Sequence, residues 1–183
     1  MRAIALVAFF FVFTTLLSAQ SLYKASKSEL SFFSSTPMED IKAVSKEAQS
    51  LINPINNEIA VVVGVSSFHF PSSLMEEHFN ENYMESEKYP KSSFKGTIAD
   101  ISKVKLKADG TYPVNVSGDL TLHGVTGKVN TKGTLTIKGG KVTGHSVFTI
   151  ALADYKIEIP KLVEKNISKT IEITVRCLYD QQL

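Results

Sequence analysis

Cysteine is nearly absent from this chain of 183 residues, because Cys177 is the only one. A single cysteine excludes an intramolecular disulfide. Ile171, Ile173 and Val175 precede it at every second position, which predicts that Cys177 lies on the apolar face of a final strand. A buried thiol without a neighbouring base only fills space, so we expect no cysteine chemistry.

Arginine is also scarce, since 18 of the 20 basic residues are lysine, and the lysines are spread along the chain. The formal net charge is +2, because 18 acidic residues nearly balance the basic ones. Nucleic-acid-binding domains instead gather basic residues on one face. The composition therefore argues against nucleic acid as a partner.

Residues suited to catalysis or metal binding are few. The chain has only four histidines, His69, His78, His123 and His145. None stands in a metal-ligand spacing such as His-Glu-x-x-His, and neither a nucleophile-elbow pattern nor a phosphate-binding glycine loop is present. Glu81 could meet His78 or Glu77 on one helix face, but such spacings are common on surfaces. We therefore predict a protein that is not an enzyme and has no cofactor and no metal.

Charged residues are missing from a stretch near the N-terminus. After Met1-Arg2, an almost unbroken apolar run extends to Leu17, and Ala19 follows as a small residue. This order is typical of a secretory signal peptide. We expect cleavage of residues 1–19, which predicts a periplasmic or secreted protein. An uncleaved anchor is less favoured because the run is short for a membrane span.

The remaining residues, 20–183, have the composition of one globular domain. The sequence is 43% hydrophobic and 21% charged, which supplies enough apolar surface for a core. Gln20 stands where a lipoprotein would carry its acylated cysteine. We therefore expect a protein that is soluble after leader cleavage. Transient membrane contact and a dimer both stay open.

The most regular pattern in the chain lies on either side of His123-Gly124. Leu120 and Leu122 alternate with polar residues before this corner, and the alternation resumes at Val125. Gly124 can adopt the backbone of a tight reversal. The pattern predicts a long antiparallel hairpin over residues 111–137, with His123 bonded to nearby backbone at its corner.

Short strands and a helix are expected at the start of the mature chain. Residues 22–26 and 29–34 are predicted as strands, with a Ser-Lys-Ser turn between them. Thr36, with a proline after it and Glu39 three residues on, resembles a helix start. We therefore predict a helix from residue 36 to about 51, with one apolar face formed by Ile41, Val44, Ala48 and Leu51.

A strand and a second helix follow. Ile59, Val61, Val63 and Val65 would form the inward face of this strand, which we expect to continue towards Phe68 and Phe70. Ser73 and Glu76 form a capping-box pattern. The pattern predicts a helix from Ser73 to about residue 82.

From residue 90 onward, strands follow one another with short turns. The stretches are 94–98, 104–106, 111–122, 125–137, 142–152 and 168–178. Short connections without crossovers favour an all-β, antiparallel barrel of about eight strands over a sandwich. Glycines recur on the predicted inner faces at Gly118, Gly127, Gly133 and Gly144. Missing side-chain volume at these positions predicts an apolar cavity.

Three stretches carry a family resemblance. They are the helix His78 to Met84, Tyr-Pro-Lys-Ser-Ser-Phe from Tyr89, and Leu-Thr-Leu-His-Gly-Val-Thr from Leu120. In this order they resemble the YceI-like lipid/polyisoprenoid-binding family. The resemblance implies an exported, lipocalin-like barrel with one or two helices, which holds a long-chain isoprenoid or similar amphiphile. Residues 23–35 depart from the family pattern, because they lack the Asp and His common near its first strand.

Apolar side chains on the predicted inner faces are the candidate ligand contacts. Removing apolar surface from water gains about 25 cal/mol per Å², so a hydrocarbon chain can bind without charged contacts. The candidates are Phe32, Val61, Val63, Phe68, Phe70, Phe94, Ile98, Leu120, Leu122, Phe148, Ile150 and Ile173. For any one of them, ordinary core packing is the simpler interpretation.

A second function stays open beside carriage or storage of a lipid. The chain could be a non-catalytic interaction or stress-protective module that uses the barrel as a scaffold. The acidic helical segment from Glu76 to Glu87 would then dock a partner through Glu77, Glu81 and Glu85.

Overall fold

The computed structural model describes residues 22–99 and 101–183. The signal peptide expected at residues 1–19 lies outside this part, so its cleavage stays a prediction. Within the described residues, none of the helices has both the length and the apolar content that crossing a bilayer requires.

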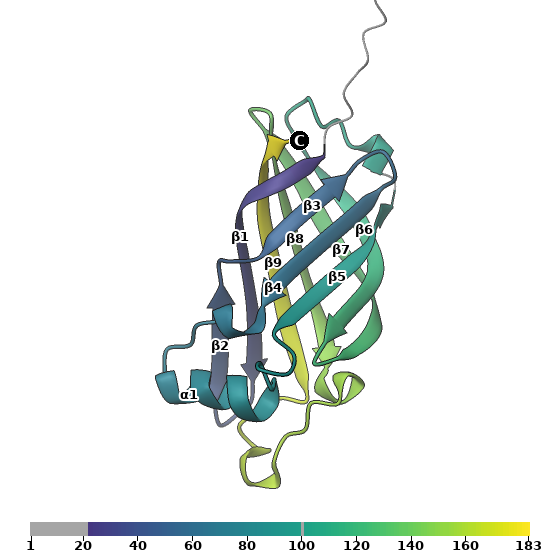
Figure 1. Cartoon of the computed structure of the whole chain (residues 1–183). Coiled ribbons are helices and arrows are strands. Elements are labelled where there is room, and N and C mark those ends of the chain that lie inside the picture. The colour runs from purple at the N-terminus through teal and green to yellow at the C-terminus, as the bar shows by residue number, and fades with distance from the viewer. Residues whose placement is uncertain (1–21, 100) are drawn as a thin grey trace, which may run out of the picture.

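In this part of the chain, nine strands form one antiparallel sheet. They are β1 (Tyr23–Ser35), β2 (Asp40–Ser45), β3 (Gln49–Asn53), β4 (Glu58–Gly64), β5 (Lys91–Ala99), β6 (Gly110–Leu122), β7 (Val125–Lys138), β8 (Lys141–Ala151) and β9 (Thr170–Gln182). Their order is β2-β1-β3-β4-β5-β6-β7-β8-β9, and β1 also pairs with β9. Eight strands thus close into a barrel, and β2 is an additional strand beside β1 (Figure 1). The predicted antiparallel barrel is confirmed.

Strand β1 is one long strand where the sequence predicts two. The two predicted stretches belong to the same strand, which pairs with β9 along most of its length. The predicted turn between them is an irregularity in the ladder, because the register shifts between Lys24 and Lys27. Ser28 is a buried residue of this strand, and its hydroxyl donates a hydrogen bond to the Ala48 carbonyl at 2.5 Å.

The helix predicted from residue 36 to about 51 is wrong, because the chain forms β2 and β3 there. Thr36 organises a turn instead. Its hydroxyl oxygen accepts hydrogen bonds from the backbone N–H groups of Met38 and Glu39, at 3.2 and 3.1 Å. The features that suggested a helix cap therefore belong to the turn that connects β1 to β2.

Burial in β2 and β3 follows the two-residue period of a strand. Ala43 and Ser45 of β2 are fully buried, and Ile52 of β3 is 2% exposed. Leu51, which the predicted helix would bury, is 39% exposed and points outward. Pairing of both strands with β1 outweighs the local helix preference of this stretch.

Six short helical segments occupy connections in the described chain. They are η1 (Val65–Ser67), α1 (Ser73–His78), η2 (Phe79–Tyr83), η3 (Ile101–Lys103), η4 (Leu152–Tyr155) and η5 (Lys161–Val163). α1 and η2 together cover the second predicted helix, whose N-cap lies one residue earlier, at Ser72. The strand predicted at residues 104–106 is wrong, because turns replace it after η3 while Val104 is buried.

From β3 onward, the connections alternate between the two ends of the barrel, because each strand is antiparallel to the next. One end carries the turns β3–β4, β5–β6 and β7–β8 and the C-terminus (Figure 1). The other end carries the longest connections, residues 65–90 between β4 and β5 and residues 152–169 between β8 and β9. We call this second end, at the bottom of Figure 1, the mouth.

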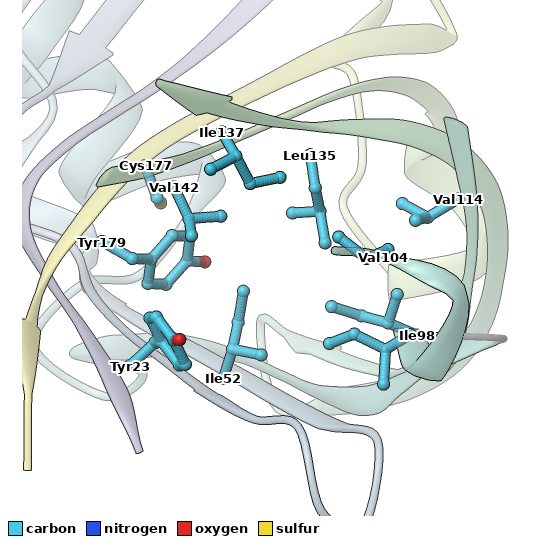
Figure 2. Packing of buried hydrophobic residues seen from close by; sticks show 11 residues of the cluster. Tyr23, Ile52, Ile98, Val104, Val114, Leu135, Ile137, Val142, Cys177 and Tyr179 are labelled. Carbon is cyan, nitrogen blue, oxygen red and sulfur yellow. The ribbon is translucent and has the colours of Figure 1, made fainter. Parts of the chain in front are cut away.

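Buried side chains close the end opposite the mouth. Figure 2 shows them pointing inward from the surrounding strands, among them Tyr23, Ile52, Ile98, Leu135 and Tyr179. Ile101 and Val104, from the connection that contains η3, complete this cluster. The Tyr179 hydroxyl is hydrogen-bonded to the Ser50 hydroxyl at 2.7 Å. A ligand would therefore enter from the mouth.

Aromatic rings lie beside three of the four glycines that the sequence places on inner faces. The rings of Phe94, Tyr155 and Tyr179 approach Gly118, Gly127 and Gly144, respectively. At the fourth, Gly133, the His145 carbonyl oxygen lies against the position of a Cβ. The glycines thus make room for rings and close backbone contacts. The prediction that absent side-chain volume at these glycines creates the cavity is therefore wrong, although Gly133 and Gly144 do belong to the cavity wall.

Gly118→Ala is expected to destabilise the fold by about 1–3 kcal/mol. The added Cβ would collide with the Lys95 carbonyl oxygen and the Gly96 Cα of the neighbouring strand. Urea unfolding followed by circular dichroism measures the change. Gly64→Ala is the control, because atoms nearest to its added Cβ lie 3.8 Å away. A Gly118→Ala protein as stable as the control would contradict the close approach of β5 and β6.

Candidate ligand cavity

The barrel encloses a cavity of about 440 Å³ that extends from the closed end to the mouth. All twelve residues selected from the sequence lie on its wall: Phe32, Val61, Val63, Phe68, Phe70, Phe94, Ile98, Leu120, Leu122, Phe148, Ile150 and Ile173. They come from six strands and from the segment after η1. The structure therefore brings them together around one space. Their contact with a ligand is a proposal taken up below.

The wall also contains residues that the sequence prediction did not select. Val116, Val129 and Val175 belong to strands and lie at two-residue spacing on the inner faces. Alternation could therefore have identified them. Phe79 and Ile167 reach the wall from the long connections at the mouth. No periodicity places these two at a cavity, because only the folded connection decides what they face.

Phe79 of η2 holds the helical segment against the barrel. Its ring centroid lies 5.3 Å from that of Phe32 in β1 and 5.1 Å from that of Phe70. Phe68 joins the cluster at 5.6 Å from Phe32. Aromatic pairs at such distances add about 0.5–1.5 kcal/mol beyond the burial of their surface. The four rings form an apolar cover at the mouth.

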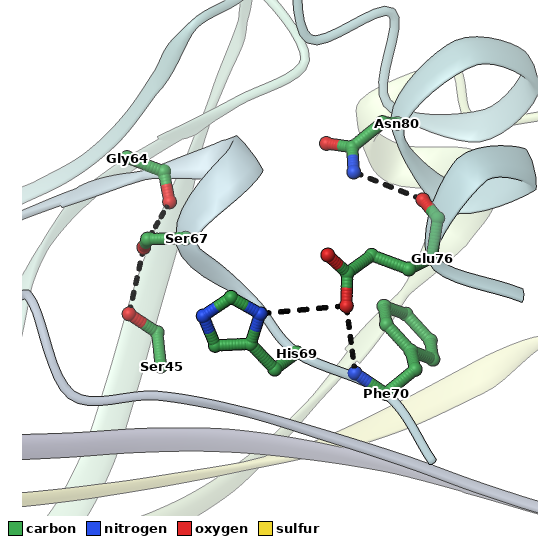
Figure 3. Close-up of polar contacts among 7 residues, drawn as sticks. All are labelled: Ser45, Gly64, Ser67, His69, Phe70, Glu76 and Asn80. Carbon is green, nitrogen blue, oxygen red and sulfur yellow. Dashed lines mark hydrogen bonds and ion pairs between the residues drawn. The ribbon is translucent and has the colours of Figure 1, made fainter. Parts of the chain in front are cut away.

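The predicted continuation of β4 towards Phe68 and Phe70 is wrong, because η1 ends the strand first. The Ser67 hydroxyl fixes this turn by donating to the Gly64 carbonyl at 2.7 Å (Figure 3). It is also hydrogen-bonded to the Ser45 hydroxyl at 2.7 Å. Both rings still face the cavity, but they do so from an irregular segment.

Glu76 ties α1 to the segment that precedes it (Figure 3). Its Oε2 accepts a hydrogen bond from the Phe70 N–H at 3.1 Å and lies 3.4 Å from His69 Nδ1. The capping box predicted for Ser73 and Glu76 is therefore wrong. The carboxylate fixes the path of the chain into the helix, and the Ser72 hydroxyl caps it by accepting from a backbone N–H at 3.5 Å.

Two buried groups of the closed end have raised pKa values. Burial raises the pKa of the Cys177 thiol and that of the Tyr179 phenol. Cys177 is 1% exposed, so the prediction of a buried thiol is confirmed. A protonated, enclosed thiol is a poor nucleophile. The closed end therefore contributes packing rather than reactive groups.

Two hydroxyls on the cavity wall are engaged by the backbone. Ser92 donates to the Thr121 carbonyl at 3.0 Å, and the Ser34 hydroxyl accepts from the Ser168 N–H at 2.9 Å. Across residues 22–99 and 101–183, no three side chains of His, Cys, Asp or Glu lie close enough together to hold a metal ion. The wall thus offers a ligand mainly apolar surface.

His123 joins three segments at the mouth. It occupies the β6–β7 turn with a φ of 50°. Its Nε2 lies 2.8 Å from Glu85 Oε2, and its Nδ1 lies 3.2 Å from the Tyr155 carbonyl oxygen. With Glu85 ionised, both partners accept, so both hydrogen bonds form together only when both ring nitrogens carry a proton. The expected backbone bond is thus present, but its partner is 32 residues away rather than nearby.

The same contact changes the acidic surface that the alternative function would use. The Glu85 carboxylate is bound by His123 and lies 3.5 Å from Lys88 Nζ. Glu77 and Glu81 remain exposed on the helical segment. Of the three carboxylates considered for partner docking, two therefore face solvent and the third belongs to the contacts of the mouth.

We expect His123→Ala to raise the pKa of Glu85 towards its ordinary value. In the native protein this pKa is lowered, chiefly because His123 donates a hydrogen bond to the carboxylate. Because folding lowers the pKa, the contact stabilises the protein at neutral pH, and this stabilisation is lost as the pH falls through the pKa of Glu85. NMR titration of the carboxyl carbon measures the shift. His145→Ala, at an exposed position on β8, is the control, and an equal pKa in both variants would contradict the contact.

The sequence matches one protein-family model over most of its length. The model describes a YceI-like domain and matches residues 22–178, which include β1 to β8 and most of β9. No curated protein matches the chain.

Solved structures with similar folds include three bacterial proteins. A polyisoprenoid binding domain from Saccharophagus degradans, implicated in plant cell wall breakdown, is 20% identical with a TM-score of 0.76, covering 86% of this chain and 97% of that one. BcnA from Burkholderia cenocepacia is 18% identical with a TM-score of 0.68, and the match covers 82% of this chain and 95% of that one. The YCEI protein from Campylobacter jejuni is 13% identical with a TM-score of 0.56, covering 99% of each chain. At sequence identities of 13–20%, the similarity to these structures shows a shared fold and nothing further.

Proposed function

Because the chain belongs to the YceI-like domain family and encloses an apolar cavity, we propose that it binds a long-chain isoprenoid or a similar amphiphile for carriage or storage. The cavity is the observation that carries this proposal. The apolar run before residue 19 supports export, which would place the protein in the periplasm or outside the cell. The solved domain from Saccharophagus degradans, which is named for polyisoprenoid binding, supports the ligand class.

The size and lining of the cavity suit a hydrocarbon chain. Its volume of about 440 Å³ falls within the range of roughly 300–1,000 Å³ typical of small-molecule sites. Phenylalanine and aliphatic side chains dominate the wall. Each Å² of apolar surface that a ligand removes from water there stabilises the complex by about 25 cal/mol. Binding would therefore grow with the length of chain that the cavity accommodates.

The two ends of the cavity support one orientation of such a ligand. The closed end consists of packed side chains around Ile98 and Tyr179, which suits an apolar chain terminus. The mouth adds Glu39, His78 and Asn166 to the wall. A polar head group at the mouth would keep its contact with water and with these side chains, so it would not bear the cost of burial.

Native protein is expected to retain an isoprenoid-like lipid through purification. A chain held by apolar contacts inside a barrel leaves slowly, because its exit exposes the whole chain to water. Native mass spectrometry of protein from its own envelope measures occupancy, and organic extraction followed by mass spectrometry identifies the lipid. Protein that stays empty after incubation with a range of isoprenoids would contradict the proposal.

Ile173→Trp is expected to lower the affinity for a long-chain isoprenoid by at least about tenfold, because the indole ring of tryptophan would occupy part of the cavity. Ile173 is half-buried on the wall and pairs with Phe148 of the adjacent strand β8. Thr149→Trp is the matched control, since Thr149 is exposed on the outside of the neighbouring strand. Fluorescence titration with a labelled isoprenoid measures affinity, and circular dichroism verifies folding. Equal affinities in two folded variants would argue that the ligand lies elsewhere.

A further inference from the structure

Residues 156–169 form a loop that protrudes at the mouth, between η4 and β9 (Figure 1). Its inner side belongs to the cavity wall, to which Val163 and Ile167 contribute. Asn166 anchors the loop, because its side-chain amide donates a hydrogen bond to Glu39 Oε2 at 2.9 Å. Any contact made by the outer side of this loop thus acts close to the entrance of the cavity.

The outer side presents a single leucine among lysines. Leu162 is 95% exposed, the highest fraction among the exposed large hydrophobic residues of the described chain. Lys161 directly precedes it and Lys165 lies three residues on, and both are exposed, as is Glu164 between Leu162 and Lys165. The loop as a whole has four lysines against two glutamates. An aliphatic tip between ammonium groups matches the chemistry of an anionic bilayer surface, where acyl chains lie beneath negative phosphates.

Two further hydrophobic tips lie at the same end of the barrel. Met38, in the turn between β1 and β2, is 68% exposed, and Leu74 of α1 is 57% exposed. Glu77 of α1 and Glu81 of η2 are exposed on the helical segment. Negative lipids would repel that segment, so the electrostatics favour an approach with the lysine-flanked loop foremost. Separate tips around an entrance suit insertion into a bilayer better than a flat contact with a protein.

We propose that Leu162 and its flanking lysines dock the mouth onto an anionic lipid bilayer. Leu162 enters the interfacial region, while Lys161 and Lys165 contact lipid phosphates. Val163 follows Leu162 directly in the chain and belongs to the cavity wall, so docking places the entrance against the source of an apolar ligand. The purpose of docking rests on the proposed function, whereas docking itself is independent of it.

Vesicle flotation tests the proposal with two kinds of vesicle, phosphatidylcholine mixed with phosphatidylglycerol and phosphatidylcholine alone. Wild-type protein is expected to float with the mixed vesicles and to dissociate at high salt. Leu162→Asp should lower the partition coefficient by at least about tenfold. Lys161→Glu with Lys165→Glu should abolish the preference for anionic vesicles. Ile55→Asp is the matched control, because Ile55 is 53% exposed in the β3–β4 turn at the opposite end.

All variants share residues 1–21, so differences between them report on the substituted positions. Reduced flotation of the two loop variants, with the Ile55→Asp protein unchanged, supports the proposal. Absence of wild-type protein from the mixed vesicles, or equal flotation of wild type and Leu162→Asp, overturns it. Equal flotation on both vesicle types overturns the role of the lysines. Lipid extraction measures occupancy separately, so a protein that holds isoprenoid but does not float would contradict docking alone.

Discussion

The pairing of β1 with β9 is the constraint on which the rest of the structure depends. These strands are the first and last of the described chain, and their ladder joins Leu30 to Val175 and Phe32 to Ile173. Closure leaves the eight barrel strands without a free edge and converts one face of the sheet into an enclosed surface. The inner apolar residues then face one another across a cavity instead of water.

Closure also determines where a ligand could enter. Because the strands from β3 to β9 alternate in direction, the two longest connections leave the barrel at the same end. One connection brings Phe79 onto Phe32, and the other brings Val163 and Ile167 to the wall. The opposite end has shorter turns and is filled by the cluster around Tyr179. The positions of the entrance, of its apolar cover and of the candidate membrane contact therefore all follow from the alternating directions of the strands.

The contacts at the mouth connect elements that the chain order separates widely. His123, in the shortest turn of the mouth, meets Glu85 from the first long connection and the Tyr155 carbonyl from the second. The Tyr155 ring in turn occupies the space beside Gly127. These contacts link both connections to the β6–β7 hairpin, so the geometry of the entrance depends on a few side chains outside the ligand-facing wall.

By itself, the sequence determined the strands from residue 90 onward except the one expected at 104–106, together with the closed antiparallel barrel and inner positions such as Phe94, Leu120 and Phe148. Alternation suffices for these, because the two-residue period reports directly which side chain shares a face. Only the tertiary structure decided that the stretch after Thr36 pairs with β1 as strands, and that rings lie beside glycines such as Gly118. It also decided which atoms surround His123 and which residues the long connections bring to the mouth. These features depend on contacts between residues distant in sequence, whose energies outweigh local preference and leave no periodic trace in the chain.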